Sequence, residues 1–175
     1  MILAFDTYYF ADKAKTVCLQ FENWADEKPN AIYEETLTGI AEYVSGEFYK
    51  RELPCILSLL KQINVEEIKV IVVDGFVFLD DDGKLGLGGY LYVDLGRAIP
   101  VIGVAKTNFA TLIKNKVAVE RGESKRPLYI TSIGMDLENA AEKIQAMHGI
   151  YRMPTLLKQL DTLTKEIADG TKTVS

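Results

Sequence analysis

The sequence contains few of the residue types that direct a chain to particular chemistries. Its 175 residues include a single histidine, His148, and only two cysteines, Cys18 and Cys55. Two cysteines this far apart exclude a disulfide framework and a zinc knuckle, and are typical of reduced thiols in a cytoplasmic protein. A Ser-His-Asp triad would have only His148 to use. Because His148 follows an amphipathic segment and precedes Gly149, we expect a cation at a helix C-terminus instead.

Long hydrophobic runs are also missing. No apolar run approaches the about 20 residues that span a bilayer, and no basic flank precedes Asp6 near the N-terminus. We therefore expect no membrane partner, no signal peptide and a cytoplasmic location. The content of 48% hydrophobic and 26% charged residues is ordinary for a globular protein and predicts one domain over residues 1–175, with a frayed tail from Gly170. The sequence does not indicate an oligomeric state.

An excess of positive charge is missing as well. The net charge of −5 argues against broad, nonspecific coating of nucleic acid, which needs many Lys and Arg residues on phosphates. A local basic rim is compatible with this balance. The segment 114–126 has five basic residues and two acidic ones, and it is either such a rim or a solvated loop.

Hydrophobic patterning predicts an α/β fold. Three successive strand-like segments without intervening helices, at 1–5, 16–21 and 31–38, predict an antiparallel meander. Further strands are predicted at 68–73, 100–104 and 128–131, and helices at 53–63, 107–113, 136–147 and from Pro154 onward, while 85–97 is ambiguous. This order predicts a mixed sheet with three antiparallel N-terminal strands and helices on both faces.

Three carboxylates stand where such a fold places functional groups. Asp6 ends the first apolar run, Asp74 ends another, and Glu52 opens a predicted helix. Hard cations such as Mg²⁺ take oxygen ligands, and two such ions can clamp the attacking and leaving oxygens of a phosphodiester. These residues therefore form a candidate metal site. Alternatively, Asp6 and Asp74 begin turns and Glu52 is a helix-capping carboxylate.

The motifs around these acids resemble those of the endonuclease V family. The resemblance rests on Tyr-x-x-Gly-x4-Arg-Glu at 43–52, Val-Asp-Gly at 73–75 and Ile-Gly-Val-Ala-Lys at 102–106. It runs in the same order from Asp6 to about Pro154. The resemblance implies a ribonuclease-H-like fold and cleavage of DNA or RNA near deoxyinosine or inosine, with Mg²⁺ or Mn²⁺ as cofactor.

The resemblance also implies residue roles. Asp6, Glu52 and Asp74 would be catalytic metal ligands, and Lys106 would stabilise phosphate charge in the transition state. The alternative for Lys106 is a surface lysine that begins a helix. The residues implied in nucleic-acid binding are Tyr8, Tyr43, Gly46 and Arg51.

Several family positions are changed in this chain. Asp80 and Tyr90 stand at or near the spacing of two family histidines, and Met135 replaces a third. Asp80 is either an additional metal ligand, since carboxylate oxygens suit Mg²⁺, or part of a polar turn. Tyr43 keeps the aromatic residue of the family's base-recognition loop, but the prolines that stiffen that loop are absent.

Three interpretations of function follow. The first is a metal-dependent endonuclease of the endonuclease V type. The second is a nuclease of the same fold that acts on another nucleic acid. The third is a non-catalytic binding protein, because a fold alone does not decide a function. Because the family histidines are missing, we expect any cleavage of inosine-containing substrate to be slower than that of a member with the full motif set.

Overall fold

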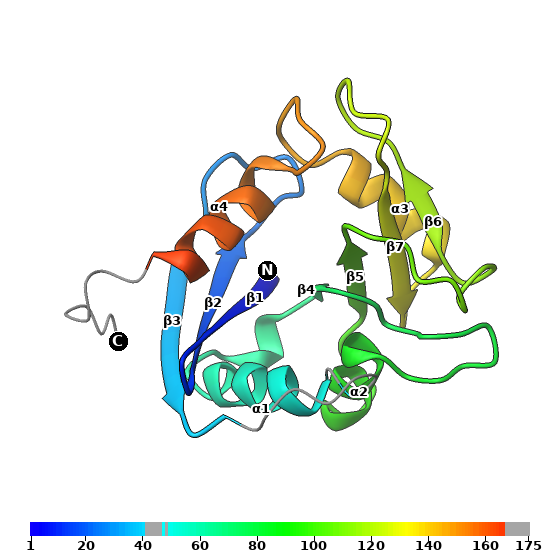
Figure 1. Cartoon of the computed structure of the whole chain (residues 1–175). Helices are drawn as coiled ribbons and strands as arrows, with labels where there is room; N and C mark the ends of the chain where they lie inside the picture. Colours follow the sequence, from blue (N-terminus) through cyan, green and yellow to red (C-terminus); the bar gives the residue numbers. More distant parts are fainter. Residues whose placement is uncertain (41–46, 48, 167–175) are drawn as a thin grey trace.

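The computed structural model describes residues 1–40, 47 and 49–166. Its sheet has seven strands in the order β3-β2-β1-β4-β5-β7-β6 (Figure 1). The strands are β1 (Ile2–Phe10), β2 (Lys13–Phe21), β3 (Ala31–Thr38), β4 (Val70–Asp74), β5 (Val101–Ala105), β6 (Val117–Val119) and β7 (Leu128–Ile133). The helices are α1 (Tyr49–Leu60), α2 (Leu87–Asp94), α3 (Leu137–Gln145) and α4 (Thr155–Lys165), and a short 3₁₀ turn, η1, covers Val65–Glu67.

The N-terminal strands form the expected antiparallel meander. β1 pairs with β2 along its whole length, and β2 pairs with β3. The expectation that the first strand ends at Asp6 is wrong, because β1 continues to Phe10 in its pairing with β2. The parallel pairing of β1 with β4 nevertheless stops at the pair Phe5 and Val73. Asp6 is therefore the first residue of β1 that has no paired residue in β4. Its side chain stands where β4 no longer runs alongside β1.

Beyond the meander, the sheet becomes mixed. β1, β4 and β5 are parallel neighbours, whereas β7 is antiparallel to both β5 and β6. Parallel strands need both faces covered, and each face has its own apolar core. On one face, α4 packs over β1 and β2, and α3 packs over β6 and β7. On the other face, α1 packs over β1, β2 and β3, and α2 packs over β5 and β7 (Figure 1). The α/β class with helices on both faces is confirmed, while the ribonuclease-H-like character stays a prediction.

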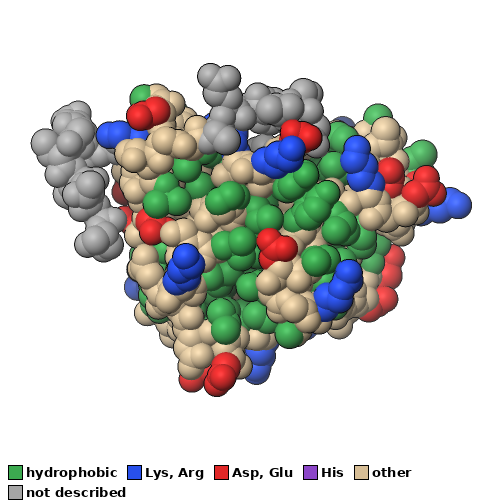
Figure 2. Space-filling view, turned by 90° about the horizontal axis from the view of Figure 1, so that it is seen from below, with side chains coloured by type: hydrophobic (Ala, Val, Ile, Leu, Met, Phe, Trp, Pro, Cys, Tyr) green, Lys and Arg blue, Asp and Glu red, His purple; other side chains and the backbone are tan. Residues whose placement is uncertain are grey.

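The face that carries α1 and α2 is rich in apolar side chains (Figure 2). Tyr49, Leu57, Tyr90 and Leu95 are partly buried there against the core beneath them. None of the helices in the described ranges is long and apolar enough to cross a membrane. This apolar character therefore belongs to the packing of the amphipathic helix α1 and the largely apolar helix α2 on the sheet.

Two local expectations are wrong, and one ambiguity is resolved. Residues 107–113 form turns and not a helix: Leu112 is buried, but Ile113 is 72% exposed, so the apolar residues there do not share one buried face. α1 begins at Tyr49, so Pro54 lies past the first turn of the helix. The ambiguous segment 85–97 contains α2. The short strand β6 was not predicted.

Candidate active site

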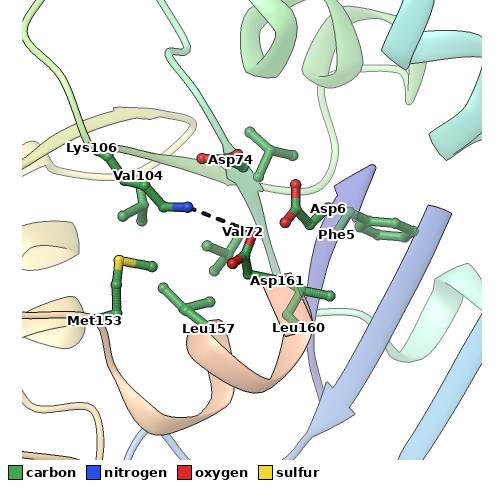
Figure 3. A pocket seen from close by; sticks show the side chains of 11 residues that line it. Phe5, Asp6, Val72, Asp74, Val104, Lys106, Met153, Leu157, Leu160 and Asp161 are labelled. Carbon is green, nitrogen blue, oxygen red and sulfur yellow. Dashed lines mark ion pairs between the residues drawn. The ribbon is translucent and has the colours of Figure 1, made fainter. Parts of the chain in front are cut away.

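The site lies at the ends of the three parallel strands. Asp6 follows the last parallel pair of β1, Asp74 is the last residue of β4, and Lys106 follows β5 directly. Because parallel neighbours end at the same edge of a sheet, their terminal residues meet although they are far apart in sequence. Of the three predicted acids, Asp6 and Asp74 line one cavity together with Lys106 (Figure 3), whereas Glu52 does not line it.

A small cavity separates these side chains from α4. Its volume is about 20 Å³, enough for roughly one water-sized guest. Its polar lining consists of Asp6, Asp74, Lys106 and Asp161 (Figure 3). The walls are apolar side chains from the strands and from α4, namely Phe5, Val72, Val73, Val104, Met153, Leu157 and Leu160. A polar guest in this cavity would therefore contact carboxylates at close range.

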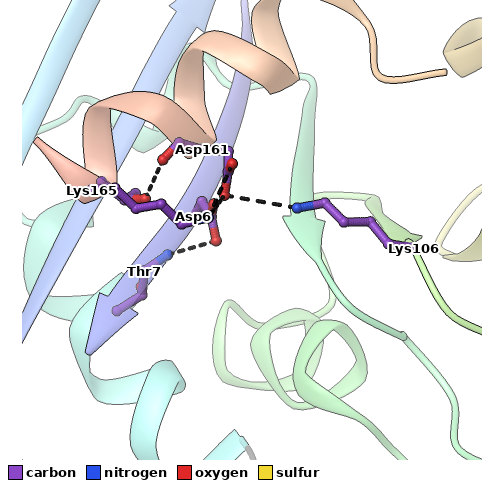
Figure 4. Close-up of polar contacts among 6 residues, drawn as sticks. Asp6, Thr7, Lys106, Asp161 and Lys165 are labelled. Carbon is purple, nitrogen blue, oxygen red and sulfur yellow. Dashed lines mark hydrogen bonds and ion pairs between the residues drawn. The ribbon is translucent and has the colours of Figure 1, made fainter. Parts of the chain in front are cut away.

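Asp161 is the member of this cluster that the sequence analysis missed. It comes from α4, and its Oδ1 lies 3.8 Å from Lys106 Nζ and 3.2 Å from Lys165 Nζ (Figure 4). A signal was present in the sequence: Leu157, Leu160 and Thr164 face the core from α4, and Asp161 shares that helical face. An acid on the buried side of an amphipathic helix indicates a polar partner beneath it.

The aspartates repel one another in this enclosed position. Burial, and then the charge of Asp74, raise the pKa of Asp6 from 3.8 to about 7, although the Thr7 backbone N–H donates to Asp6 Oδ1 at 2.9 Å (Figure 4). Burial also raises the pKa of Asp74, against the opposing effects of Lys106 and of a hydrogen bond with Asp6. The pair therefore holds its protons more tightly than free carboxyl groups do.

Glu52 stands behind this pair in the first turn of α1. It is only 2% exposed, and burial together with the charges of Asp6 and Asp74 raises its pKa well above the usual value. A hydrogen bond with the Thr7 side chain opposes that shift, and Thr7 Oγ1 lies 3.0 Å from Thr16 Oγ1. Glu52 Oε2 has no hydrogen-bond partner. A buried, unsatisfied carboxylate oxygen is costly and is suited to accept a cation.

The chemistry of the donor set fits a divalent cation. Four carboxylates, Asp6, Glu52, Asp74 and Asp161, share three cationic side chains, those of Lys106, Lys165 and Arg51. Full ionisation therefore leaves one negative charge uncompensated. Among the described residues, no three acidic, histidine or cysteine side chains form a ready-made metal cage. Mg²⁺ does not require one, because it usually binds one or two carboxylates together with waters and substrate phosphates.

Asp80 and the other two residues at former histidine positions have local roles. Asp80 Oδ1 accepts the backbone N–H groups of Asp82 and Lys84 within its own turn, as in the polar-turn alternative. Tyr90 stacks on Tyr49 with ring centroids 3.9 Å apart. Met135 packs against the core. None of the three lines the cavity.

The residues implied in nucleic-acid binding are only partly described. Tyr8 is 37% exposed and stacks on Phe10, while the Arg51 guanidinium lies 3.6 Å from the centre of the Tyr9 ring. Tyr43 and Gly46 lie outside the described residues. The structure therefore places one implied contact residue on the surface and assigns Arg51 a ring contact within the protein.

The two basic features singled out in the sequence have structural partners. Within the basic segment 114–126, Arg121 is buried and donates to the carbonyls of Met147 and Tyr151 at 2.6 Å each. It therefore does not belong to a rim. His148 pairs with Glu27 at 3.2 Å and with the Thr155 hydroxyl at 2.9 Å, away from the cavity.

Comparisons with known proteins point to one family. The family model for endonuclease V matches residues 1–129, whereas no curated protein sequence matches the chain. The structure is similar to endonuclease V from Streptomyces avermitilis, with a TM-score of 0.70 at 21% identity over 93% of this chain and 78% of that one. It is also similar to endonuclease V from Bacillus subtilis, with a TM-score of 0.71 at 19% identity over 93% of this chain and 77% of that one.

A third similar structure contains nucleic acid. Endonuclease V from Ciona intestinalis, in complex with a 24-mer DNA that contains an inosine followed by a ribo-adenosine, has a TM-score of 0.70 at 18% identity. The similarity covers 93% of this chain and 83% of that one. At these identities, the three structures establish a shared fold.

Proposed function

Since this chain belongs to the endonuclease V family, we propose that it is a divalent-metal-dependent endonuclease that cleaves phosphodiester bonds in DNA or RNA. The observation that carries the proposal is the cavity in which Asp6, Asp74 and Asp161 meet Lys106. The three carboxylates come from different elements and have oxygens suited to Mg²⁺ or Mn²⁺, and Lys106 follows β5.

In this proposal, Asp6 and Asp74 hold the metal, Asp161 completes the ligand set from α4, and Glu52 supports it from behind through its unsatisfied Oε2. A bound divalent ion supplies Lewis-acid stabilisation of phosphate charge and lowers the pKa of coordinated water. Lys106 is placed to contact a phosphate oxygen once the nucleic acid competes with Asp161 for its ammonium group. The apolar walls of the cavity limit the access of bulk water and so strengthen these charge interactions.

We further propose that cleavage occurs near deaminated bases. Support comes from the family motifs at 43–52 and 73–75 and from the inosine in the DNA bound to the Ciona protein. The altered positions favour a second candidate, a nucleic-acid-binding protein of this fold that has lost or changed its specificity. The specific observation is that Asp80 and Tyr90 are engaged in a turn and in a ring stack, so neither replaces the acid–base chemistry of a histidine.

One cleavage assay tests the proposal. Purified protein is incubated with Mg²⁺ or Mn²⁺ and with labelled DNA and RNA, each with and without one inosine. We expect cleavage that needs the metal and is faster on the inosine strands. The matched control is Asp74→Asn, which keeps the shape of the side chain and removes its charge.

The outcomes separate the candidates. Cleavage that Asp74→Asn abolishes supports the endonuclease. Equal cleavage of all strands supports the nuclease and contradicts the preference for deaminated bases. Binding of the strands without any metal-dependent cleavage would overturn the enzymatic proposal in favour of the binding protein.

A further inference from the structure

An aromatic pair stands beside the candidate active site. Phe76 follows Asp74 by two residues, and Phe109 follows Lys106 by three. Since successive Cα atoms are about 3.8 Å apart, the backbone of each phenylalanine lies within about 8 to 11 Å of a site residue. The two ring centroids are 5.8 Å apart and tilted by 45°. The loops after β4 and β5 are thus joined by an aromatic contact at the edge of the sheet where the cavity lies.

The loop that carries Phe109 is held firmly by polar contacts. The Asp81 carboxylate accepts the backbone N–H groups of Ile113, Lys114 and Asn115 at 2.8 to 3.1 Å. The Thr111 hydroxyl donates to the carbonyl of Leu79 at 2.6 Å. These bonds connect the loop after β5 to the loop after β4 without using either phenylalanine ring.

The ring of Phe109 is therefore not needed to anchor its loop. Leu112, three residues later, is fully buried and already supplies an apolar anchor, whereas Phe109 stays 39% exposed. An exposed aromatic ring on a fixed loop loses little conformational freedom when a planar group stacks on it. Phe76 is partly buried and contacts the Phe109 ring from one side.

The surroundings suit a nucleic-acid strand. Lys106 and Lys114 flank Phe109 on the same loop, and Lys116 Nζ donates to the Asn108 side chain and to the carbonyl of Phe109 at 3.4 Å. A combination of lysines that track phosphates with an aromatic ring that stacks on bases is the usual design for binding single strands.

We propose that Phe109, supported by Phe76, is a stacking site for an unpaired base of the bound strand, next to the phosphate that Lys106 contacts. The inference rests on the nucleic-acid substrate of the proposed function. Because every base has a π-face, the site accepts any base, and it would hold the strand in place without reading its sequence.

Binding measurements with oligonucleotides test this stacking site. Fluorescence anisotropy with Ca²⁺ in place of Mg²⁺ gives the dissociation constant of a labelled single strand for the parent chain and for Phe109→Ala. We expect binding to weaken by about 5-fold to 100-fold, in line with the loss of one base stack. The matched control is Ile113→Ala, which removes another exposed apolar side chain of the same loop and leaves its backbone bond to Asp81 in place.

A series of strands, each with one abasic position, separates stacking from a structural effect. For the parent chain, we expect one abasic position to weaken binding more than the others do. For Phe109→Ala, that position should lose its special sensitivity, whereas Phe109→Trp should keep it. Additive effects of the substitution and of every abasic position would overturn the stacking site, as would equal losses for Phe109→Ala and Ile113→Ala.

The test is independent of cleavage. Phe109-dependent binding without cleavage supports the stacking site and contradicts only the enzymatic proposal. Metal-dependent cleavage with unchanged binding by Phe109→Ala supports the enzyme and overturns only the stacking site.

Discussion

Asp161 shows how much a single residue changes at this site. It adds a third carboxylate to the cavity and shares Lys106 with the nucleic acid of the proposed function. We expect Asp161→Asn to reduce metal-dependent cleavage by at least about tenfold, because second contacts to metal ligands alone contribute 10- to 100-fold. Single-turnover rates in Mg²⁺ measure the effect. Asp82→Asn, an exposed acid outside the cavity, is the control, and equal rates for the two variants would contradict a role for Asp161.

The raised carboxyl pKa values predict an unusual pH dependence of stability without metal. Folded Asp6 keeps its proton up to pH about 7, whereas the unfolded chain loses it near 3.8. The unfolded state therefore binds fewer protons between these values, and the free energy of unfolding falls as the pH rises through that window. The pKa values of Glu52 and Asp74 are raised as well and act in the same direction.

Urea unfolding in EDTA at pH 5 and pH 8 measures this dependence. We expect lower stability at pH 8, a smaller difference for Asp6→Asn, and a larger stabilisation by Mg²⁺ at pH 8 than at pH 5, because the metal binds the ionised form. Metal-free protein that is more stable at pH 8 would show that other groups outweigh the buried acids.

Residue patterns revealed part of the site before the structure did. Asp74 was found because it ends a buried strand, and Lys106 because it closes the family motif at 102–106; such strand ends meet at one edge of a parallel sheet. Asp161 was missed because the apolar spacing of its helix drew attention to the leucines alone. Asp80 stayed open between a polar turn and a metal ligand, since a carboxylate that accepts backbone N–H groups looks the same in sequence as one that binds metal; its bonds match the polar turn.

At the scale of elements, α4 is secured to the sheet by a buried lysine. Lys15 of β2 is 8% exposed, and its Nζ donates to the carbonyls of Leu163 and Glu166 at 2.8 Å each. A cation at a helix C-terminus also interacts favourably with the helix dipole. The position of Asp161 beside Lys106 depends on this attachment.

Removal of that amine should loosen the helix. We expect Lys15→Met to lower the free energy of unfolding by about 1–3 kcal/mol, because two carbonyls lose a charged donor, and to slow cleavage through displacement of Asp161. Lys13→Met, at an exposed position of the same strand, is the matched control. Urea unfolding of both variants measures the effect. Equal free energies of unfolding for Lys15→Met and Lys13→Met would show that water replaces the Lys15 amine without cost.

The success of prediction also differed among the elements. The N-terminal meander and the Asp136-capped helix α3 were predictable, because alternation and the capping residue are local signals. The segment 107–113 was not, because the backbone N–H groups at its end, those of Ile113 and of Lys114 just beyond it, go to Asp81, 32 and 33 residues away in sequence. A tertiary contact of this kind prevents the helix that the apolar spacing predicts, and the neighbouring sequence contains no signal of it.

For the whole molecule, the net charge of −5 limits how nucleic acid binds. Lys106, Lys114 and Lys116 are the lysines of the loop beside the cavity. With about three phosphate contacts, we expect the logarithm of the binding constant for a single strand to fall with the logarithm of salt concentration with a slope of about −2. A salt titration by anisotropy measures it. A slope steeper than about −5 would indicate extensive contacts elsewhere on the surface.

The distance in sequence between Asp6 and Asp161 has a consequence for the time course of biosynthesis. Chains are made at about 5–20 residues per second, so the 155 residues that separate the two positions take roughly 8 to 30 seconds. Throughout that interval, the growing polypeptide carries its first acid without the helix that encloses it. The cavity therefore closes late, because the ribosome adds α4, which forms one of its walls, near the end of synthesis.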